Sequence, residues 1–166
     1  MIIGCGGAGK STLAQQLSTK LNLELIALDQ LYWRPNWTET PKEEWIKIVE
    51  EAAQKKNWIM DGNYSGTMDL RIKKATHIIF LDFPTWLCLF RILKRTWRFY
   101  GQPRPEMPEN CPERFDWGFT HYVLTYRRIR RPRILNRLKG LSNKKQLFIL
   151  KNPKEVHQFL ERISTK

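Results

Sequence analysis

The chain has 166 residues, 42% of them hydrophobic, which is enough for one domain with a core and too few for two full domains. We expect neither a secretory signal nor a membrane span, because a span needs an apolar run of roughly 20 residues. The three cysteines lack the spacing of a disulfide framework or a zinc site. A cytoplasmic protein is therefore expected. The net charge is +13, and residues 84–166 hold 19 of the 29 basic but only 6 of the 16 acidic residues. We therefore expect this half of the chain to bind an anionic partner, either a phosphorylated small molecule or nucleic acid.

Short apolar runs alternate with helical patterns along the chain. The runs predict five strands, over residues 1–3, 23–28, 58–60, 77–81 and 146–150. Helices are predicted over residues 10–21, 40–56 and 68–75, and from residues 84, 116 and 153 onward. This alternation indicates a parallel sheet covered by helices on both faces. The first strand is shorter than the typical length of about five residues, which leaves open that residues precede it in a longer chain.

Local signals set the expected boundaries of several elements. The segments Thr40-Pro41-Lys42-Glu43 and Asn152-Pro153-Lys154-Glu155 each give an N-cap residue, a proline and a glutamate in the order of a helix start. Asp29 is expected to end the second strand. Residues 101–112 carry four prolines and predict a loop, and Pro132 is expected to bend or break the helix that contains it.

The first strand leads into a glycine-rich motif. Residues Gly4 to Ser11 read GCGGAGKS and fit the pattern G-x-x-x-x-G-K-[ST], which binds nucleotide phosphates. The backbone of Gly6, Gly7, Ala8 and Gly9 would form a nest of N–H groups at the start of a helix. Lys10 would reach the β- and γ-phosphates, the Ser11 hydroxyl would bind Mg²⁺, and Thr12 would add a hydroxyl near the α-phosphate. The motif therefore predicts ATP and Mg²⁺ as cofactors.

Other features of the sequence indicate which class of nucleotide-binding protein carries this motif. A GTPase needs an Asn-Lys-x-Asp segment to read its base, and the nearest segment, NKKQ at 143–146, lacks the aspartate. The chain is also short for the larger ATPase modules. A small kinase, in which an acceptor binds opposite ATP, remains the favoured class.

Five segments spread along the chain carry a family resemblance. They are Gly4 to Thr12, Leu28 to Pro35, Asp61 to Thr67, Phe80 to Asp82 and Tyr126 to Arg128. Together they resemble the DNA topology modulation protein family, whose members are adenylate-kinase-like P-loop proteins. The resemblance covers nearly the whole chain. It implies a three-layer α/β P-loop fold with a five-stranded parallel sheet, in a single domain over residues 1–166 with a helical lid inserted at about 96–126.

Adenylate kinases, more distantly similar, suggest roles for the loop after the third strand. By this resemblance Asp61 would hold a Mg²⁺-bound water, and Asn63 and Tyr64 would bind the acceptor. The arginine that such kinases use in this loop for a nucleoside monophosphate is absent, which argues against AMP as the acceptor. Arg71, on the next helix, is the candidate to replace it.

Further arginines are assigned by the same resemblance. Arg91 and Arg95 are four residues apart and share one helix face, where Arg91 would lie against adenine and Arg95 would contact phosphate. After the lid, the candidates for the transferred phosphoryl group are Arg127, Arg128 and Arg131. The segment Lys151-Asn152-Pro153 lies where such kinases wrap adenine with backbone. Arginine suits phosphate because its charged fork matches the oxygen geometry.

The acceptor side of the predicted site has two interpretations. Asp29 follows the second strand, at the edge of an α/β sheet where ligands bind, and would orient or deprotonate an acceptor hydroxyl; the alternative is a turn aspartate. Tyr32, Trp33 and Arg34 follow it and would contact the acceptor, with a hydrophobic seal under the next helix as the alternative. Asp82, by contrast, is expected to have a structural role at the end of the fourth strand.

These observations favour transfer of the ATP γ-phosphoryl group to a small nucleotide-like or nucleoside-like acceptor. The basic and aromatic run from Trp86 to Arg137 supports an alternative, a nucleic-acid-associated protein that uses ATP as a switch or hydrolyses it slowly. No motif in the sequence identifies the acceptor.

Overall fold

A five-stranded parallel sheet forms the centre of the molecule. The computed structural model describes residues 1–104, 107–108, 110–141 and 145–164. The strands are β1 (Ile2–Gly4), β2 (Leu25–Ala27), β5 (Ile59–Asp61), β6 (His77–Leu81) and β7 (Gln146–Leu150), in the order β2-β5-β1-β6-β7. In register, Ile2 pairs with both Asp61 and Ile79. The prediction of an α/β fold with five parallel strands is confirmed.

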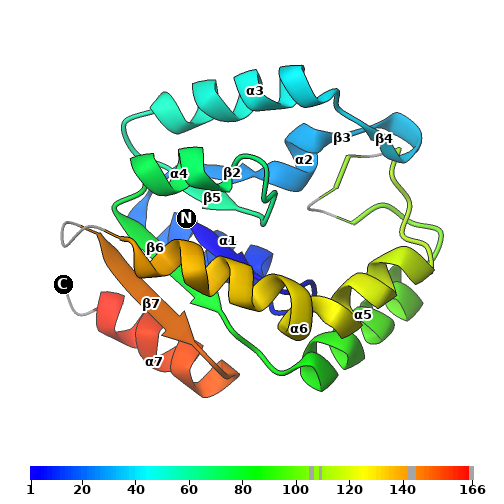
Figure 1. The fold of residues 1–166 in the computed structure, drawn as a ribbon. Coiled ribbons are helices and arrows are strands. Elements are labelled where there is room, and N and C mark those ends of the chain that lie inside the picture. Colours follow the sequence, from blue (N-terminus) through cyan, green and yellow to red (C-terminus); the bar gives the residue numbers. More distant parts are fainter. Residues whose placement is uncertain (105–106, 109, 142–144, 165–166) are drawn as a thin grey trace.

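Helices cover both faces of this sheet (Figure 1). The longer ones are α1 (Lys10–Leu21), α3 (Lys42–Gln54), α4 (Met68–Lys74), α5 (Thr85–Phe99), α6 (Trp117–Lys139) and α7 (Pro153–Ser164). Helix α1 contacts α7, α3 contacts α4, and α5 contacts α6. Residues 78–81 of β6 are all buried although successive side chains point to opposite faces, which is the pattern of a strand covered on both sides.

Two hydrophobic clusters hold the layers together. The larger one joins β1 and β6 to α1, α5 and α6, through residues such as Ile3, Phe80 and Val123. The smaller one joins β2 and β5 to α3, through residues such as Met60 and Val49. Because the strands are parallel, the carboxyl ends of β1, β2, β5 and β6 lie at the same edge of the sheet. Ligands bind at this edge in open α/β folds.

The region after β2 differs from the prediction. The strand ends at Ala27, two residues before Asp29, and the short helix α2 (Leu28–Tyr32) follows directly. Leu28 is fully buried in the smaller cluster, which fixes the start of this helix. A hairpin of β3 (Trp33–Arg34) and β4 (Thr38–Glu39), joined by the 3₁₀ turn η1 (Pro35–Trp37), then precedes α3. The sequence analysis did not predict α2 or this hairpin.

The two predicted helix starts have different outcomes. Asn152 caps α7 as expected: its Oδ1 accepts from the Glu155 backbone N–H at 3.0 Å, and the Glu155 carboxylate accepts from the Lys151 N–H at 2.7 Å. The prediction for Thr40 is wrong, because Thr40 Oγ1 instead donates to the Tyr32 carbonyl at 2.6 Å. That contact ties the residue after the hairpin to the end of α2, and α3 is left without a side-chain cap.

Pro132 does not end its helix. The sequence predicted a bend or a break, and the break is contradicted because α6 runs for 23 residues with Pro132 in its interior. The residue is exposed, and water can therefore satisfy the carbonyl that a proline ring leaves without an N–H partner. The predicted loop at 101–112 lies outside the helices and the named strands in its described part.

Candidate active site

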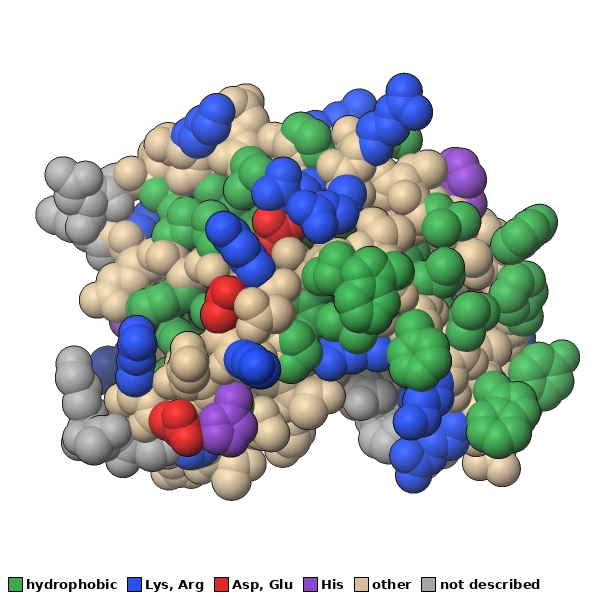
Figure 2. Space-filling view, turned by 90° about the horizontal axis from the view of Figure 1, so that it is seen from below, with side chains coloured by type: hydrophobic (Ala, Val, Ile, Leu, Met, Phe, Trp, Pro, Cys, Tyr) green, Lys and Arg blue, Asp and Glu red, His purple; other side chains and the backbone are tan. Residues whose placement is uncertain are grey.

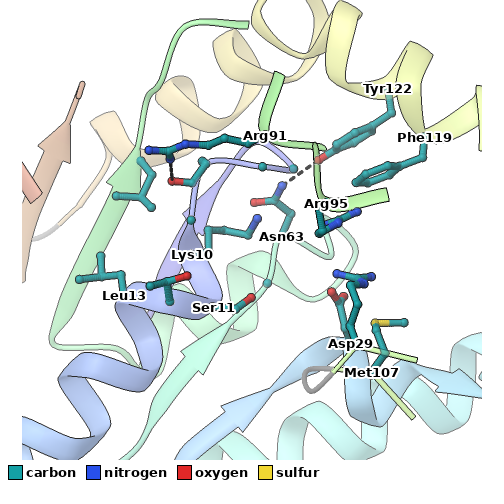
Figure 3. Close-up of a pocket in the computed structure, with 18 of the residues that line it drawn as sticks. Lys10, Ser11, Leu13, Asp29, Asn63, Arg91, Arg95, Met107, Phe119 and Tyr122 are labelled. Atoms are coloured by element: carbon teal, nitrogen blue, oxygen red, sulfur yellow. Dashed lines mark hydrogen bonds between the residues drawn. The ribbon is translucent and has the colours of Figure 1, made fainter. Parts of the chain in front are cut away.

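A cavity of about 910 Å³ opens at the carboxyl edge of the sheet. The glycine-rich loop, α5, the hairpin and the start of α6 all contribute to its lining. In Figure 3, Leu13 and Arg91 lie at one end, Asp29 and Met107 lie at the other, and Lys10 and Ser11 lie between them. The volume is within the usual range for small-molecule sites.

The glycine-rich loop has a shape that side chains would prevent. Gly7 and Gly9 have φ angles of 75° and 90°, the left-handed region that favours glycine. A Cβ on Gly7 would lie 2.3 Å from the Cys88 carbonyl oxygen of α5. Gly9 stands at the N-cap of α1 with no side-chain cap, which leaves the N–H groups of the first turn open to an anion. The predicted phosphate loop therefore lines the cavity with its backbone.

Lys10 and Ser11 begin α1 and face the same space. Lys10 Nζ donates to the Cys5 carbonyl at 3.1 Å, and Ser11 Oγ donates to Asp61 Oδ2 at 2.7 Å. Thr12 also lines the cavity. The structure thus brings the predicted metal residues Ser11 and Asp61 together, although they are 50 residues apart in the sequence. They offer a hydroxyl and a carboxylate, the hard oxygen donors that Mg²⁺ prefers.

Arg91 and Arg95 project from α5 toward the loop and toward α6 (Figure 3). Arg91 Nη1 donates to the Ala8 carbonyl at 3.4 Å, and its guanidinium lies 5.5 Å from the centre of the Phe83 ring. Arg95 donates to Glu113 Oε1 from Nε and Nη2, at 3.2 and 3.1 Å. Both arginines line the cavity.

Glu113 is an important residue that the sequence analysis missed. Its side chain is 4% exposed and binds Arg95 through Oε1 and Arg104 through Oε2, the latter at 2.6 Å. The Thr96 hydroxyl donates to the same carboxylate at 2.8 Å. One carboxylate therefore holds two arginines against the cavity. Glu113 is one of four acidic residues between positions 106 and 116, so its position in the sequence does not single it out, and its partners follow only from the fold.

Asp29 lies at the far end of the cavity, in the first turn of α2. Tyr64 Oη donates to its Oδ1 at 2.6 Å. Burial, with the Asp29 charge as a further cause, raises the pKa of Tyr64, so the phenol keeps its proton and remains a donor. The Tyr64 ring packs against Trp45 and Tyr32, each with a centroid separation of 4.8 Å.

The other predicted acceptor residues separate into those in the cavity and those outside it. Trp33, Asn63 and Tyr64 line the cavity. Tyr32 packs beneath Tyr64, and Arg34 forms an ion pair with Glu44 in which both side chains are about half exposed.

Arg71 is fully buried and does not line the cavity. It donates to the backbone carbonyls of Gly62, Asn63 and Tyr64, and burial lowers its pKa to about 10. In this structure it supports the loop after β5 from below and does not reach the acceptor space.

Asn63 links three elements around the loop. Its side chain accepts from the Gly4 N–H at 3.0 Å and donates to the Gly4 carbonyl and to Tyr122 Oη, both at 2.7 Å. The pKa of Tyr122 is raised to about 12, mainly by burial. Phe119, one turn earlier on α6, closes over the loop, since a Cβ on Gly6 would lie 2.6 Å from its ring. The aromatic residues of α6 were not among the predicted site residues.

The arginines of α6 do not line the cavity. Arg127 and Arg128 are exposed. Arg131 donates from Nε and Nη2 to the two oxygens of Asp82, each at 2.7 Å, and this contact raises the pKa of Arg131. Asp82 is buried at the end of β6.

The predicted adenine-binding segment lies beside the loop only in part. Pro153 lines the cavity. The Lys151 N–H and the Asn152 side chain are engaged in capping α7.

Sequence comparisons identify few relatives of this chain. No protein-family model matches it. An uncharacterized protein of Bacillus subtilis strain 168, YqaC, is 30% identical over 104 residues. That match covers 60% of this chain, and the chain spans 57% of the length of YqaC.

Structural comparisons identify the fold. An unliganded crystal structure of a sugar kinase from Janibacter sp. HTCC2649 matches with a TM-score of 0.52 and 17% identity, over 99% of this chain and 90% of that one. A deoxyadenosine kinase from M. mycoides with bound dCTP matches with a TM-score of 0.46 and 16% identity, over 99% and 98% of the two chains. The similarity to the sugar kinase, together with the strand order and the phosphate loop, shows a P-loop kinase fold.

Proposed function

We propose that this protein transfers the γ-phosphoryl group of Mg·ATP to a small nucleotide-like or nucleoside-like acceptor. The observation that carries this proposal is the phosphate loop at one cavity, with Lys10 on the loop and Ser11 in contact with Asp61. In such a reaction these groups would meet the β- and γ-phosphates of a nucleotide bound on the loop. The arginines beside the loop add the charge that phosphoryl transfer requires.

The residues present fit a magnesium ion that shares its coordination with ATP. Among the residues that the structure describes, no three His, Cys, Asp or Glu side chains form a metal cluster. Mg²⁺ needs no such cluster when phosphate oxygens and waters supply most of its ligands. Ser11 would bind it directly, and Asp61 would hold a coordinated water. The ion would neutralise charge on the phosphates.

Several predicted roles become part of this proposal. Lys10 and Arg95 would neutralise the transferred group, Arg91 would lie against the adenine end, and the backbone of residues 6–9 would hold the phosphates. Arg128 and Arg131 would need to leave their present positions to reach the cavity, because one is exposed and the other is bound to Asp82.

We also propose that the segment 96–126 acts as a lid. Residues 105, 106 and 109 of it lie outside the described residues. In the described part, the Asn110 and Pro112 carbonyls accept from Asn36 N and Trp37 Nε1 of the hairpin, at 3.0 and 3.1 Å. These contacts join the segment to the hairpin at Trp37, which lines the cavity. Membership of the DNA topology modulation family and a cytoplasmic location remain predictions; no helix within the described ranges combines the length and apolar character of a membrane span.

The decisive test is turnover by the Lys10→Ala variant, with Lys47→Ala as the control because Lys47 is exposed on α3. Loss of the loop lysine should lower ADP formation from Mg·ATP by at least about 100-fold, while the control should retain the wild-type rate. Binding of ATP by calorimetry separates a loss of affinity from a loss of chemistry. Normal turnover in Lys10→Ala would refute the proposal.

A second candidate function, binding of single-stranded nucleic acid, is favoured by one surface. Helix α5 and its C-cap residue expose a row of large apolar side chains at spacings of four and three residues, formed by Trp86, Phe90, Leu93, Trp97 and Tyr100. Figure 2 shows hydrophobic side chains gathered on one part of this face, with Lys and Arg side chains beside them. Bases stack on such rings, and cations bind the phosphates.

The salt dependence of oligonucleotide binding tests this second candidate. Steep weakening of binding between low and physiological salt, together with loss of binding in Trp97→Ala, is expected if the surface binds nucleic acid. No measurable binding at low salt would exclude it.

A further inference from the structure

The end of the cavity away from Arg91 has its own chemistry. We call it the acceptor end and define it by Asp29, Trp33, Trp37, Glu39 and Met107, all of which line the cavity. It presents two carboxylates, two indole rings and a thioether. Figure 3 shows Asp29 and Met107 there, on the far side of Lys10 and Ser11 from Arg91. An acceptor in this position would face the γ-phosphate of a nucleotide on the loop.

The Asp29 carboxylate is held in one orientation. Tyr64 Oη donates to Oδ1 at 2.6 Å, and the Tyr64 ring is fixed by Trp45 and Tyr32. Among the described residues, the Tyr64 hydroxyl is the one hydrogen-bond donor to the Asp29 carboxylate. The phenol stays protonated because burial raises its pKa. Asp29 is therefore positioned to accept a proton from a ligand in the cavity.

The arginines around this end already have partners, and Arg95, which lines the cavity, is assigned above to the phosphoryl group that ATP donates. Arg71 binds backbone carbonyls beneath the loop, and Arg34 pairs with Glu44 on the surface. Arg95 and Arg104 both bind Glu113.

Among the residues that the structure describes, Arg114 is the remaining arginine at this end, and its guanidinium lies 5.7 Å from the centre of the Trp37 ring. A single arginine therefore stands against the carboxylates of Asp29 and Glu39. A phosphate monoester with two negative charges would be repelled more than it is attracted, and its desolvation would not be compensated. An uncharged alcohol meets no such barrier: its hydroxyl can donate to Asp29, and a flat group can pack on Trp33.

We propose that the acceptor is an uncharged alcohol that carries a flat ring, the chemistry of a nucleoside, and that Asp29 is its general base. This inference rests on the proposed function and specifies its acceptor. The hydroxyl proton passes to the Asp29 carboxylate as the hydroxyl oxygen forms a bond to the γ-phosphorus. The bond from that phosphorus to the β–γ bridging oxygen breaks, and ADP leaves with the electron pair. Tyr64 is a positioning residue that fixes the carboxylate.

The test compares matched acceptors that differ only in one phosphate. ADP formation from Mg·ATP is measured with adenosine, guanosine, cytidine, thymidine and their 5′-monophosphates, and the product is identified by mass spectrometry. At least one nucleoside should raise ADP formation about tenfold or more above the rate without acceptor, with its monophosphate as product. The matching 5′-monophosphate should not do so.

The outcomes separate this inference from the proposed function. Stimulation by monophosphates alone would overturn the inference and leave phosphoryl transfer standing. Binding of Mg·ATP without stimulation by any nucleoside would also overturn the inference. Absence of Mg·ATP binding would overturn the proposed function itself.

Two substitutions test the roles of Asp29 and Tyr64 with the stimulating nucleoside. Asp29→Asn should lower kcat at least about 100-fold with an unchanged affinity for ATP. Asp69→Asn is the matched control, because Asp69 is exposed on α4 and outside the cavity. Tyr64→Phe keeps the ring packing and loses only the hydroxyl, so a purely structural role predicts an unchanged kcat. A fall in kcat of about tenfold is expected if the hydroxyl positions the base. Wild-type kcat in a folded, ATP-binding Asp29→Asn variant would overturn the assignment.

Discussion

The two ends of the cavity are built from the sequence in different ways. The phosphate end comes from consecutive residues, 4–12, whose backbone forms the loop and the start of α1. The acceptor end is assembled from α2, the hairpin and the segment that joins α5 to α6.

This difference explains why the residues of one end of the cavity can be predicted from the sequence and the contacts of the other end cannot. A phosphate loop depends on backbone shape and on two side chains at fixed spacing, so a local pattern determines it. The rest of the cavity depends on contacts such as Asp29 with Tyr64 at the acceptor end, and Glu113 with Arg95 and Arg104 between the two ends. Such pairs are visible only after the chain has folded, and we expect the two ends to respond differently to substitution.

The largest effect is expected at the phosphate end. Gly7→Ala places a Cβ 2.3 Å from the Cys88 carbonyl oxygen at a φ of 75°, so the loop and α5 must separate. The free energy of unfolding should fall by about 3 kcal/mol, and ATP binding by calorimetry should be lost. Gly140→Ala is the control, since its Cβ would meet no atom within 4 Å. Normal ATP affinity in Gly7→Ala would show that the loop moves freely.

The next effect is expected from Glu113, between the two ends. Glu113→Gln removes a buried charge that holds Arg95 and Arg104. Breaking such a network should cost about 3 kcal/mol of unfolding free energy, measured by urea denaturation, and should raise the KM for ATP. Glu24→Gln is the control because the Glu24–Lys55 pair is about half exposed and should contribute less than about 1 kcal/mol. Equal effects of the two changes would contradict the inferred role of Glu113.

A smaller effect is expected for the arginines of α6. Arg131→Met deprives the buried Asp82 carboxylate of two hydrogen bonds, which should cost about 2 kcal/mol in thermal or urea unfolding. Arg128→Met, on the exposed side of the same helix, should change stability by less than about 0.5 kcal/mol. An unaltered stability of Arg131→Met would indicate that Arg131 leaves Asp82 readily, as the predicted phosphate role requires.

The smallest effect is expected at the cap of α7. Asn152→Ala removes the oxygen that accepts from the Glu155 N–H and should lower the free energy of unfolding by about 1 kcal/mol. Thermal unfolding followed by circular dichroism measures it. Because the sequence predicted this cap correctly, a null result would weaken the use of the motif as a boundary signal in this chain.

Elements with a local cause were predicted well. The five strands, the beginning of α1 after Gly9 and the capping of α7 follow from apolar runs, glycine spacing and an Asn-Pro-x-Glu segment. The errors at Thr40 and Pro132 have tertiary causes. Thr40 donates to the Tyr32 carbonyl at the end of α2 instead of capping its own helix. Helix α6 continues past an exposed proline because its neighbouring turns are anchored by Tyr126 and Ile134 in the core.

The sequence by itself determined the α/β class and the glycine-rich loop that leads into Lys10 and Ser11 at the start of α1, because each depends on neighbouring residues and on periodicity. Only the tertiary structure decided which distant charges meet. It placed Arg71 beneath the loop, Arg131 on Asp82 and Glu113 between two arginines. The physical reason is that a buried charge takes whichever partner the packed elements bring within hydrogen-bond distance, and separation along the chain does not constrain that choice.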